Sequence, residues 1–319
     1  MPPLVRAALA GAADAPGYPP TAGTPALADA IRGWVAAHCA AAPGFGVLPT
    51  IGSKELVAWL PTLLGIGPGD TVVLPSVCYP TYEVGVRLAG ATAVRSDSLT
   101  ALGPARVKLV WLNSPGNPTG RVLPAAHLAK VVDWARERGA VLASDECYLA
   151  LGWEERPVSV LSVCAGRYDG VLAVHSLSKR SNLAGYRAGF VAGDPALVDR
   201  LRTVRRHAGM IVPAPVQAAM AAALGDESHV AEQRDRYGAR RARLRPALEK
   251  AGFTVEHSTA GLYLWATRDE DCWSTVDWFA ARGILVSPGA FYGPDGQRHV
   301  RVALTATDER VDAAVHRLA

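Results

Sequence analysis

A lysine that follows a strand-like run is the residue best suited to covalent chemistry in this sequence. The apolar residues 170–175 predict a buried strand, and Ser176, Ser178 and Lys179 follow it directly. Polar residues at the carboxyl end of a strand in an open α/β sheet lie where such sheets bind ligands. Arg187 stands further along the same loop, which also contains glycines that permit tight turns. A lysine amine, an arginine and two hydroxyls in one loop can hold an anionic molecule and bond to it covalently.

A second group of residues has the character of a phosphate-binding turn. Gly52, Ser53 and Lys54 open a predicted helix, residues 53–64, directly after the turn-like residues 49–51. The first N–H groups of a helix lack intrahelical partners and the helix dipole is positive at that end, so an anion is favoured there. Together with the lysine and arginine of the first group, this turn predicts a phosphorylated cofactor bound covalently through an imine.

Two further polar motifs stand at the ends of predicted strands. Residues 113–120, Asn-Ser-Pro-Gly-Asn-Pro-Thr-Gly, end the strand predicted at 107–112. Residues 144–148, Ser-Asp-Glu-Cys-Tyr, end the strand predicted at 140–144. Taken singly, the first motif is an ordinary turn and the second an ordinary helix start. At one edge of a parallel sheet, however, both would lie beside Lys179.

The elements that must position these motifs alternate between strands and helices. This alternation predicts an α/β fold with a mostly parallel central sheet flanked by helices. After Gly252 short strands mix with helices, which predicts a smaller α+β domain. The predicted strands are 71–74, 92–95, 107–112, 140–144, 170–175, 188–192, 254–256, 261–266 and 300–304, and the predicted helices are 53–64, 82–88, 124–138, 195–207, 216–224, 229–251, 275–282 and 308–318.

The composition is that of a globular chain without a strong charge bias. The 319 residues include 33 Lys and Arg against 29 Asp and Glu, a net charge of +4, and 50% are apolar. These values exclude wholesale disorder and disfavour a nucleic-acid partner, although arginines crowd residues 234–245. No segment has the pattern of a signal peptide or a membrane span. The five cysteines form no Cys-x-x-Cys pair, which predicts no disulfide framework, no metal site and a reducing, cytoplasmic location.

The motifs occur in the order found in a known family. The Gly-Ser-Lys turn, Asn-Pro-Thr-Gly, Asp-Glu-x-Tyr and Ser-x-Ser-Lys followed by Gly-x-Arg-x-Gly resemble those of class I/II aminotransferases, the pyridoxal-phosphate enzymes of fold type I. The resemblance implies that Lys179 bonds to pyridoxal phosphate and moves the proton at the substrate α-carbon. It also implies that Asp145 pairs with the pyridine nitrogen and so makes the ring an electron sink.

The resemblance implies roles for further residues as well. Asn117 and Tyr148 would hydrogen-bond the phenolic oxygen of the cofactor, and Tyr79 would stack on its ring. Arg301 would bind the substrate α-carboxylate with its two-pronged guanidinium group, with Asn117 also contacting the substrate. Tyr18 would reach the cofactor phosphate of the partner subunit in a homodimer. The residues implied to bind the phosphate are Gly52, Ser53, Lys54, Ser176, Ser178 and Arg187.

The family resemblance also implies a division of the chain. Residues 30–225 would form the large cofactor-binding domain, and residues 1–29 with 226–319 the small domain, joined through a helix at 226–251. Family members usually carry further residues before the part that matches Pro2 to Tyr18, including an arm and a loop that closes over the substrate. We therefore expect closure over the substrate and arm packing to be affected in this chain.

Longer phrases resemble a narrower family, the actinobacterial succinyldiaminopimelate aminotransferases. That resemblance implies transfer of the amino group of glutamate to N-succinyl-2-amino-6-oxopimelate in lysine biosynthesis. The phrases that carry it are residues 15–31, 49–73, 112–123, 144–153, 175–198 and 300–310.

Other activities stay open on the sequence. An aminotransferase for another amino acid, or a lyase that expels a β-substituent by breaking a C–S bond, would use the same cofactor residues. Ser176 and Lys179 also form the Ser-x-x-Lys pair of penicillin-binding hydrolases, in which the lysine activates the serine. That activity is disfavoured because the chain contains no Lys-Thr-Gly and no Gly-x-Ser-x-Gly.

Overall fold

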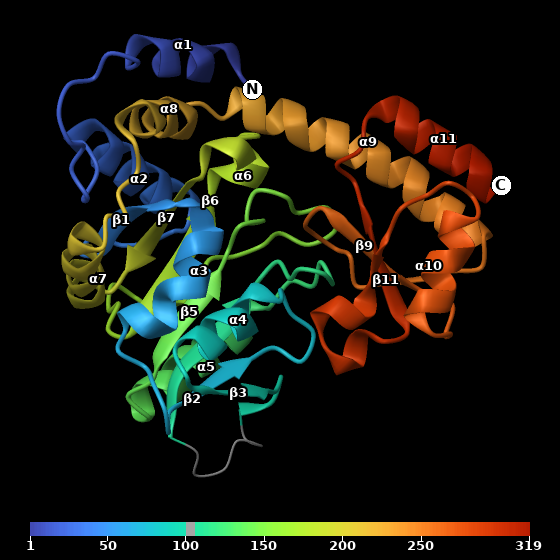
Figure 1. Cartoon of the computed structure of the whole chain (residues 1–319), viewed down its shortest axis with the longest axis horizontal. Helices are drawn as coiled ribbons and strands as arrows, with labels where there is room; N and C mark the ends of the chain where they lie inside the picture. Colours follow the sequence, from blue (N-terminus) through green and yellow to red (C-terminus); the bar gives the residue numbers. More distant parts are fainter. Residues whose placement is uncertain (100–105) are drawn as a thin grey trace.

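The computed structural model describes residues 1–99 and 106–319, which form a large part around a seven-stranded sheet and a small part around a four-stranded sheet (Figure 1). The strands of the large sheet are β1 (Gly46–Ile51), β2 (Thr71–Leu74), β3 (Thr92–Arg95), β4 (Val107–Asn113), β5 (Val141–Asp145), β6 (Val171–Ser176) and β7 (Ala188–Gly193). Their order is β1-β7-β6-β5-β4-β2-β3, and β7 alone runs against its neighbours. The predicted α/β class with a mostly parallel sheet is confirmed.

Both faces of this sheet are apolar, and helices cover each of them. In β6, Val171 and Ala173 belong to one hydrophobic cluster, and Leu172 and Val174 belong to another. This alternation is the one expected for a strand that is buried on both faces. The helices of the large part are α1 (Pro3–Gly11), α2 (Pro25–His38), α3 (Gly52–Leu63), α4 (Thr81–Leu88), α5 (Ala125–Glu137), α6 (Leu177–Arg180), α7 (Pro195–His207) and α8 (Ala214–Leu224).

The N-terminal helices pack with the large sheet, whereas residues 1–29 were expected to join residues 226–319. Val5 of α1 and Leu27 of α2 are fully buried in the same cluster as Met220 of α8. The start of α2 is also bonded to α8, because the N–H of Thr24 donates to Oε1 of Gln217 at 2.8 Å. The packing of these apolar faces therefore differs from the predicted grouping of the two chain ends.

Residues 49–51, expected in a turn, lie instead in β1. β1 is an edge strand, paired on one side with β7, and Pro49 stands opposite Phe190. Proline lacks the N–H that a central strand needs, so an edge strand is the place in a sheet where it is tolerated. The phosphate-binding turn therefore starts from a strand end, as the other motifs do.

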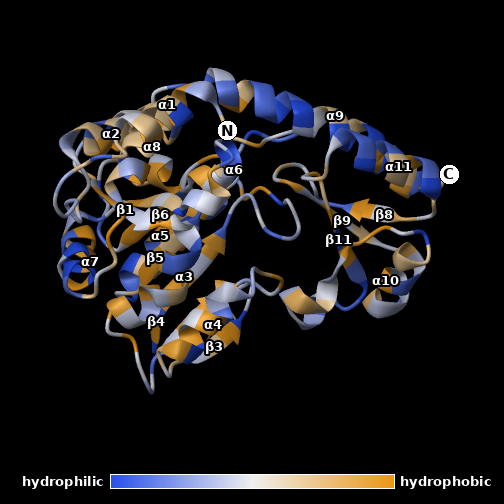
Figure 2. Cartoon of the chain, turned by 45° about the horizontal axis from the view of Figure 1, so that its top comes forward, coloured by the Kyte–Doolittle hydropathy of each residue, from blue (hydrophilic) through white to orange (hydrophobic). Residues whose placement is uncertain are grey.

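The small part is an antiparallel sheet with helices packed on it. Its strand order is β10 (Ser287–Pro288), β11 (His299–Ala303), β9 (Tyr263–Thr267) and β8 (Thr254–Glu256). The helix α9 (Ser228–Lys250) runs from the neighbourhood of α8 to α11 (Asp308–Leu318), and α10 (Cys272–Ala280) packs beside β10 and β11 (Figure 1). Figure 2 shows α9 as a largely hydrophilic helix across the top of the molecule. The predicted boundary at residues 225 and 226 stays a prediction.

Within residues 1–99 and 106–319, no helix combines the length and the apolar character that crossing a lipid bilayer requires.

Candidate active site

Most of the predicted site residues line one cavity at the carboxyl ends of β4, β5 and β6. Its volume is about 300 Å³. The predicted residues that line it are Ser53, Lys54, Tyr79, Asn117, Asp145, Tyr148, Ser176, Ser178, Lys179, Arg187 and Arg301. Sequence reasoning did not assign four other lining residues, Asn113, Cys147, Ala184 and Tyr263. Two predicted residues are not part of the cavity lining. Gly52 lies against the side chain of Arg187, which does line the cavity, and Tyr18 is 98% exposed.

Lys179 stands in α6, a single turn that begins where β6 ends. The Oγ of Ser176 caps this turn by accepting a hydrogen bond from the N–H of Ser178 at 3.1 Å. β6 is buried along its whole length, so the turn rests on a rigid base. Lys179 is thereby held half-buried at the rim of the sheet, where its amine can bond to a molecule in the cavity.

Lys54 and Arg187 contribute two cationic side chains to the cavity beside the first turn of α3. Gly52 has φ of +71°, and a Cβ at this position would lie 2.6 Å from Nη2 of Arg187. Only glycine therefore allows the guanidinium group to touch the start of the helix. Nη1 of Arg187 donates to the carbonyl of Ala184 at 2.6 Å, which fixes the arginine. The cations and the helix N-terminus together make an anion-binding end of the cavity.

The first turn of α3 is held in place by an ion pair between Glu55 and Arg205 of α7, which was not predicted from the sequence. Arg205 of α7, which is fully buried, donates to both carboxylate oxygens of Glu55 at 2.7 and 3.0 Å. Oε2 of Glu55 also accepts the N–H of Ile51 at 3.3 Å. A bidentate pair of this kind is directional, so it holds the turn in one orientation.

Asp145 provides a buried carboxylate at the end of β5. Its Oδ2 accepts a hydrogen bond from the hydroxyl of Tyr82 at 2.8 Å, and its Oδ1 accepts one from the N–H of Cys147 at 3.2 Å. Burial raises the pKa of Asp145, and the hydrogen bonds from Cys147 and Tyr82 oppose that rise. A cationic ring nitrogen beside this carboxylate would stabilise its ionised form further.

Tyr79 offers a flat aromatic surface in the same cavity. Nζ of Lys54 lies 5.8 Å from the centre of the Tyr79 ring, and the ring of Tyr82 meets it edge-on at 5.8 Å between centroids. Tyr82 is itself stacked on Trp111 at 4.9 Å. This packing fixes the aromatic side of the cavity between the cationic end and Asp145.

The loop after β4 is tied to the end of β5 by Asn113. Its Nδ2 donates to the carbonyl of Asp145 at 2.9 Å, and its Oδ1 accepts the N–H of Asn117 at 2.7 Å. Asn117 is buried, and its Oδ1 accepts a hydrogen bond from Nη1 of Arg301 at 3.0 Å. The predicted cofactor residue and the predicted carboxylate-binding residue are thus in direct contact.

Arg301 reaches the cavity from β11 of the small part. Besides Asn117, it contacts Tyr263, whose ring centre lies 3.9 Å from Cζ of Arg301. Nη2 of Arg301 also lies 3.4 Å from the hydroxyl of Ser287. Tyr148 is buried across the cavity wall, where burial raises the pKa of its hydroxyl.

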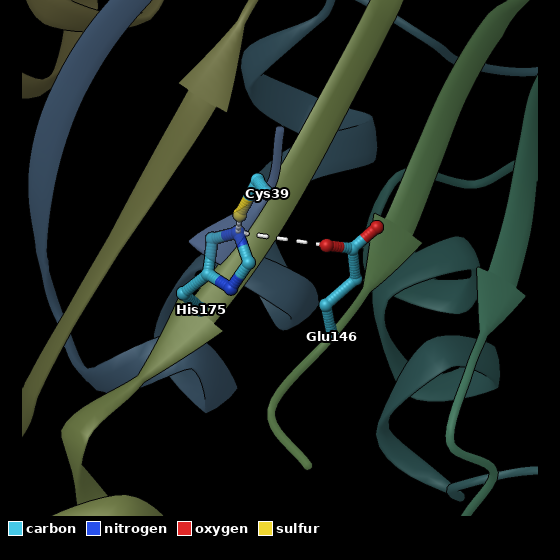
Figure 3. Close-up of side chains that lie close together, drawn as sticks. All are labelled: Cys39, Glu146 and His175. Carbon is cyan, nitrogen blue, oxygen red and sulfur yellow. Dashed lines mark hydrogen bonds and ion pairs between the residues drawn. The ribbon is translucent and has the colours of Figure 1, made fainter. Parts of the chain in front are cut away.

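Cys39, Glu146 and His175 form a buried polar cluster beside the site (Figure 3). Nε2 of His175 lies 3.6 Å from Oε2 of Glu146 and 3.8 Å from Sγ of Cys39, and Oε1 of Glu146 accepts the N–H of Val160 at 2.7 Å. Burial and the positive charge of Arg180 lower the pKa of His175 to about 3, and burial raises the pKa of Glu146 to about 7. One possible ligand atom from each of the three residues lies within 4.8 Å of the other two, but the charge of Arg180 disfavours a metal cation here.

The fold and this cavity define a protein of the aminotransferase type. The family described as aminotransferase class I and II matches residues 5–318, and the chain belongs to that family. It is therefore a pyridoxal-phosphate-dependent enzyme that transfers amino groups.

Its relatives include enzymes named for different substrates. The chain is 60% identical to the 4-dedimethylamino-4-oxo-anhydrotetracycline transaminase OxyQ of Streptomyces rimosus, over 99% of this chain and 89% of that protein. It is 62% identical to the probable aminotransferase Rv1178 of Mycobacterium tuberculosis, over 99% of this chain and 77% of that protein. Among solved structures, a probable N-succinyldiaminopimelate aminotransferase of Thermus thermophilus is 28% identical with a TM-score of 0.90, over 99% of this chain and 90% of that one.

The cavity fits pyridoxal phosphate by the chemistry of its donors and acceptors. Lys54, Arg187 and the N-terminus of α3 suit the phosphate, and the contact between Gly52 and Arg187 leaves no room for a side chain at the start of that helix. Asp145 is a buried acceptor suited to a ring nitrogen, and Lys179 is an amine suited to an aldehyde.

Proposed function

We propose that this aminotransferase exchanges an amino group between glutamate and N-succinyl-2-amino-6-oxopimelate, a reaction of lysine biosynthesis. The main observation in support of this chemistry is that Lys179, Asp145 and Arg301 line the same cavity. The substrate is supported by the Thermus thermophilus relative, whose fold superimposes on nearly the whole chain and whose name gives succinyldiaminopimelate.

Each residue of the cavity has a role in this proposal. Pyridoxal phosphate, when bound, supplies a conjugated ring that takes up the electron pair left by the substrate α-proton. Nζ of Lys179 holds the cofactor before substrate arrives and carries the α-proton afterwards. The carboxylate of Asp145 keeps the ring nitrogen protonated, and Arg301 holds the α-carboxylate that both substrates share.

The remaining residues place the cofactor for that chemistry. Asn117 and Tyr148 donate hydrogen bonds to the phenolic oxygen, and Tyr79 stacks on the ring. We also propose a homodimer, in which Tyr18 of one subunit contacts the phosphate in the other, and a cytoplasmic location. The residues proposed to bind the phosphate are Gly52, Ser53, Lys54, Ser176, Ser178 and Arg187.

A second candidate is an aminotransferase that acts on a ring ketone. The specific observation in its favour is the 60% identity to OxyQ, whose name gives an oxo-anhydrotetracycline as the substrate. Such a ketone carries no α-carboxylate for Arg301, so Arg301 would then serve only the amino donor.

One assay distinguishes these candidates. The purified holoenzyme receives glutamate with either N-succinyl-2-amino-6-oxopimelate or 4-dedimethylamino-4-oxo-anhydrotetracycline, and 2-oxoglutarate formation is measured. We expect kcat/KM to be at least about tenfold higher with the succinylated acceptor. A higher value with the ring ketone would replace the proposal by the second candidate. Release of pyruvate and ammonia from a cysteine conjugate, without 2-oxoglutarate, would instead identify a C–S lyase.

A further inference from the structure

Tyr263 lies between Arg301 and Tyr148 in the cavity and contacts both residues. Its ring centre lies 3.9 Å from Cζ of Arg301, and its hydroxyl oxygen lies 3.3 Å from that of Tyr148. The rings of Tyr148 and Tyr263 meet edge-on, with centroids 5.8 Å apart. Tyr263 is 8% exposed, and it lines the cavity. Tyr263 therefore connects the proposed carboxylate-binding arginine to Tyr148.

The pairing of β9 with β11 sets this position. Arg301 stands opposite Trp265, and Tyr263 is two residues from Trp265 on the same strand. Side chains two residues apart on a strand share one face, so Tyr263 and Arg301 are diagonal neighbours on the face toward the cavity. The alternate residues Leu262 and Leu264 are fully buried in the core of the small part and fix the strand beneath them.

The hydroxyl pair has a definite direction when the cofactor is bound. A phenol carries a single hydrogen, and Tyr148 needs its own for the phenolic oxygen of the cofactor. The contact between the two hydroxyls must then be donated by Tyr263 to the oxygen of Tyr148. A hydroxyl that accepts a hydrogen bond becomes a stronger donor, because bonds in a chain polarise one another.

We propose that Tyr263 is a positioning residue that acts on the cofactor oxygen through Tyr148 and on the substrate carboxylate through Arg301. This rests on the proposed roles of Tyr148 and Arg301. The hydroxyl strengthens the hydrogen bond from Tyr148, which stabilises the anionic form of the phenolic oxygen. The ring face holds the guanidinium group by a cation–π contact, so that its two N–H groups stay aimed at a carboxylate. The side chain thereby links the part of the site that recognises substrate to the part that prepares the cofactor.

The two contacts can be removed separately. Tyr263→Phe keeps the ring and removes the hydroxyl. We expect the pH midpoint of the visible absorption of the lysine-bound cofactor to rise by about 0.3 to 1 unit, because the anionic oxygen loses indirect support. We expect KM for glutamate to change by less than about twofold. Tyr263→Leu also removes the ring, and we expect its KM for glutamate to be about fivefold to tenfold higher than that of Tyr263→Phe.

A double variant tests whether the hydroxyl acts through Tyr148. Tyr148→Phe alone should raise the spectroscopic midpoint further than Tyr263→Phe does. Adding Tyr263→Phe to Tyr148→Phe should then cause no further shift, because the relaying hydroxyl is already gone. The matched control is Tyr292→Phe, which removes a hydroxyl near Arg301 whose ring centre lies 5.1 Å from Cζ of that arginine. The control should leave the midpoint unchanged.

Two results would overturn the inference. One is a Tyr263→Phe protein with the wild-type midpoint, and the other is a double variant whose shift equals the sum of the single shifts. Both are read on proteins that carry the visible absorption of the lysine-bound cofactor. A wild-type protein without that absorption would contradict the proposed function itself, so the two failures are distinguishable.

Discussion

Asp145 is a residue whose surroundings determine its chemistry. Burial raises the pKa of a carboxyl group because the ion loses its hydration, and hydrogen bonds from Cys147 and Tyr82 restore part of that stabilisation to Asp145. The donor on one side is a backbone N–H, which cannot be removed by substitution. The donor on the other side is the hydroxyl of Tyr82, which can be removed without disturbing the ring stacked on Trp111.

Tyr82→Phe is therefore expected to weaken the proposed contact of Asp145 with the cofactor ring nitrogen without unfolding the protein. A hydrogen bond to a charged group contributes about 1.5–3 kcal/mol, so the carboxylate should become less stable as an anion. We expect kcat to fall about tenfold and pyridoxal phosphate to dissociate several-fold more readily, as measured by steady-state kinetics and cofactor titration.

The control for that substitution is Tyr168→Phe. Tyr168 is also buried, but its hydroxyl donates to the carbonyl of Ala42 at 2.6 Å, and the residue does not line the cavity. This variant should lose stability by about 1 kcal/mol and keep the wild-type kcat. Equal kcat values for Tyr82→Phe and the wild type would show that the bond to Asp145 has no part in the reaction.

Lys179→Ala should remove both the covalent attachment and the proton carrier. We expect no cofactor adduct in the mass spectrum after borohydride reduction and a fall in kcat on the order of 10³-fold or more. Lys54→Ala is the matched comparison, since it removes another cavity lysine and should retain the adduct. An adduct that persists in Lys179→Ala would move the covalent role to another amine.

The residues that were predictable from sequence belong to short motifs at strand ends. Lys179, Asp145 and Asn117 stand within a few residues of a buried apolar run, so both their chemistry and their location could be predicted. Tyr263 could not be assigned in this way, because it is one aromatic residue in an apolar strand and only the register of β9 against β11 brings it to Arg301.

At the scale of elements, six of the seven strands of the large sheet were predicted to within a residue at each end. β2 and β3 match the predicted ranges, and β4, β5, β6 and β7 differ from them by a residue at one or both ends. β1 was missed because Pro49 is typical of a turn, and only its pairing with β7 at the sheet edge shows why proline is tolerated there. The short apolar runs of α1 and α2 bury their faces on α8, a long-range contact that local patterns do not show.

The ends of β5 and β6 are also joined by the cluster of Figure 3. Glu146 follows Asp145 directly, and His175 precedes Ser176, so the cluster lies one residue from two cavity residues. In the folded protein Glu146 keeps a proton up to about pH 7 and His175 lacks one down to about pH 3, since these are their pKa values. The unfolded groups have ordinary pKa values of 4.5 and 6.5, so between these values folding transfers one proton without a net change.

This balance predicts that the stabilities of two variants change in opposite directions with pH. In His175→Asn only the raised pKa of Glu146 remains, so its stabilising effect is present below pH 4.5 and is lost as pH rises to about 7. In Glu146→Gln only the lowered pKa of His175 remains, so stability is lost as pH falls from 6.5 to about 3. Each slope is about 1.4 kcal/mol per pH unit.

Urea unfolding at about pH 5 and about pH 6.5 measures these slopes. As the pH rises from about 5 to about 6.5, the free energy of unfolding of Glu146→Gln should increase by about 2 kcal/mol relative to the wild type. That of His175→Asn should decrease by about 2 kcal/mol over the same range. The same sign of change in both variants would contradict the proton balance within the cluster.

At the scale of the whole molecule, the cavity is made by both parts of the chain. Arg301 of the small part bonds to Asn117 of the large part. A second connection joins Arg95 of β3 to the carbonyl of Tyr292 at 3.2 Å, and the same guanidinium group pairs with Glu83 at 2.7 Å. These bonds hold Arg301, the proposed carboxylate-binding residue, at a fixed place relative to the proposed cofactor-binding residues.

The proposed dimer adds a third contributor, because Tyr18 is almost fully exposed in the single chain and lies outside the cavity lining. If Tyr18 serves the partner's site, Tyr18→Ala in one subunit and Lys179→Ala in the other damage the same site of a mixed dimer. The site that has lost its lysine would also face the subunit without the tyrosine. The other site would keep its own Lys179 and receive an intact Tyr18 from across the interface.

Co-expression of the two impaired variants should therefore restore activity. Random exchange of equal amounts makes about half of the dimers mixed, each with one intact site, so about a quarter of the wild-type activity per subunit is expected. The measurement is glutamate-dependent 2-oxoglutarate formation after co-expression of the two variants, with each variant expressed alone as the control. Tyr18→Ala should lower cofactor affinity when alone, because the phosphate loses a hydrogen-bond donor. A mixture no more active than the average of the two separate variants would show that Tyr18 does not act across the interface.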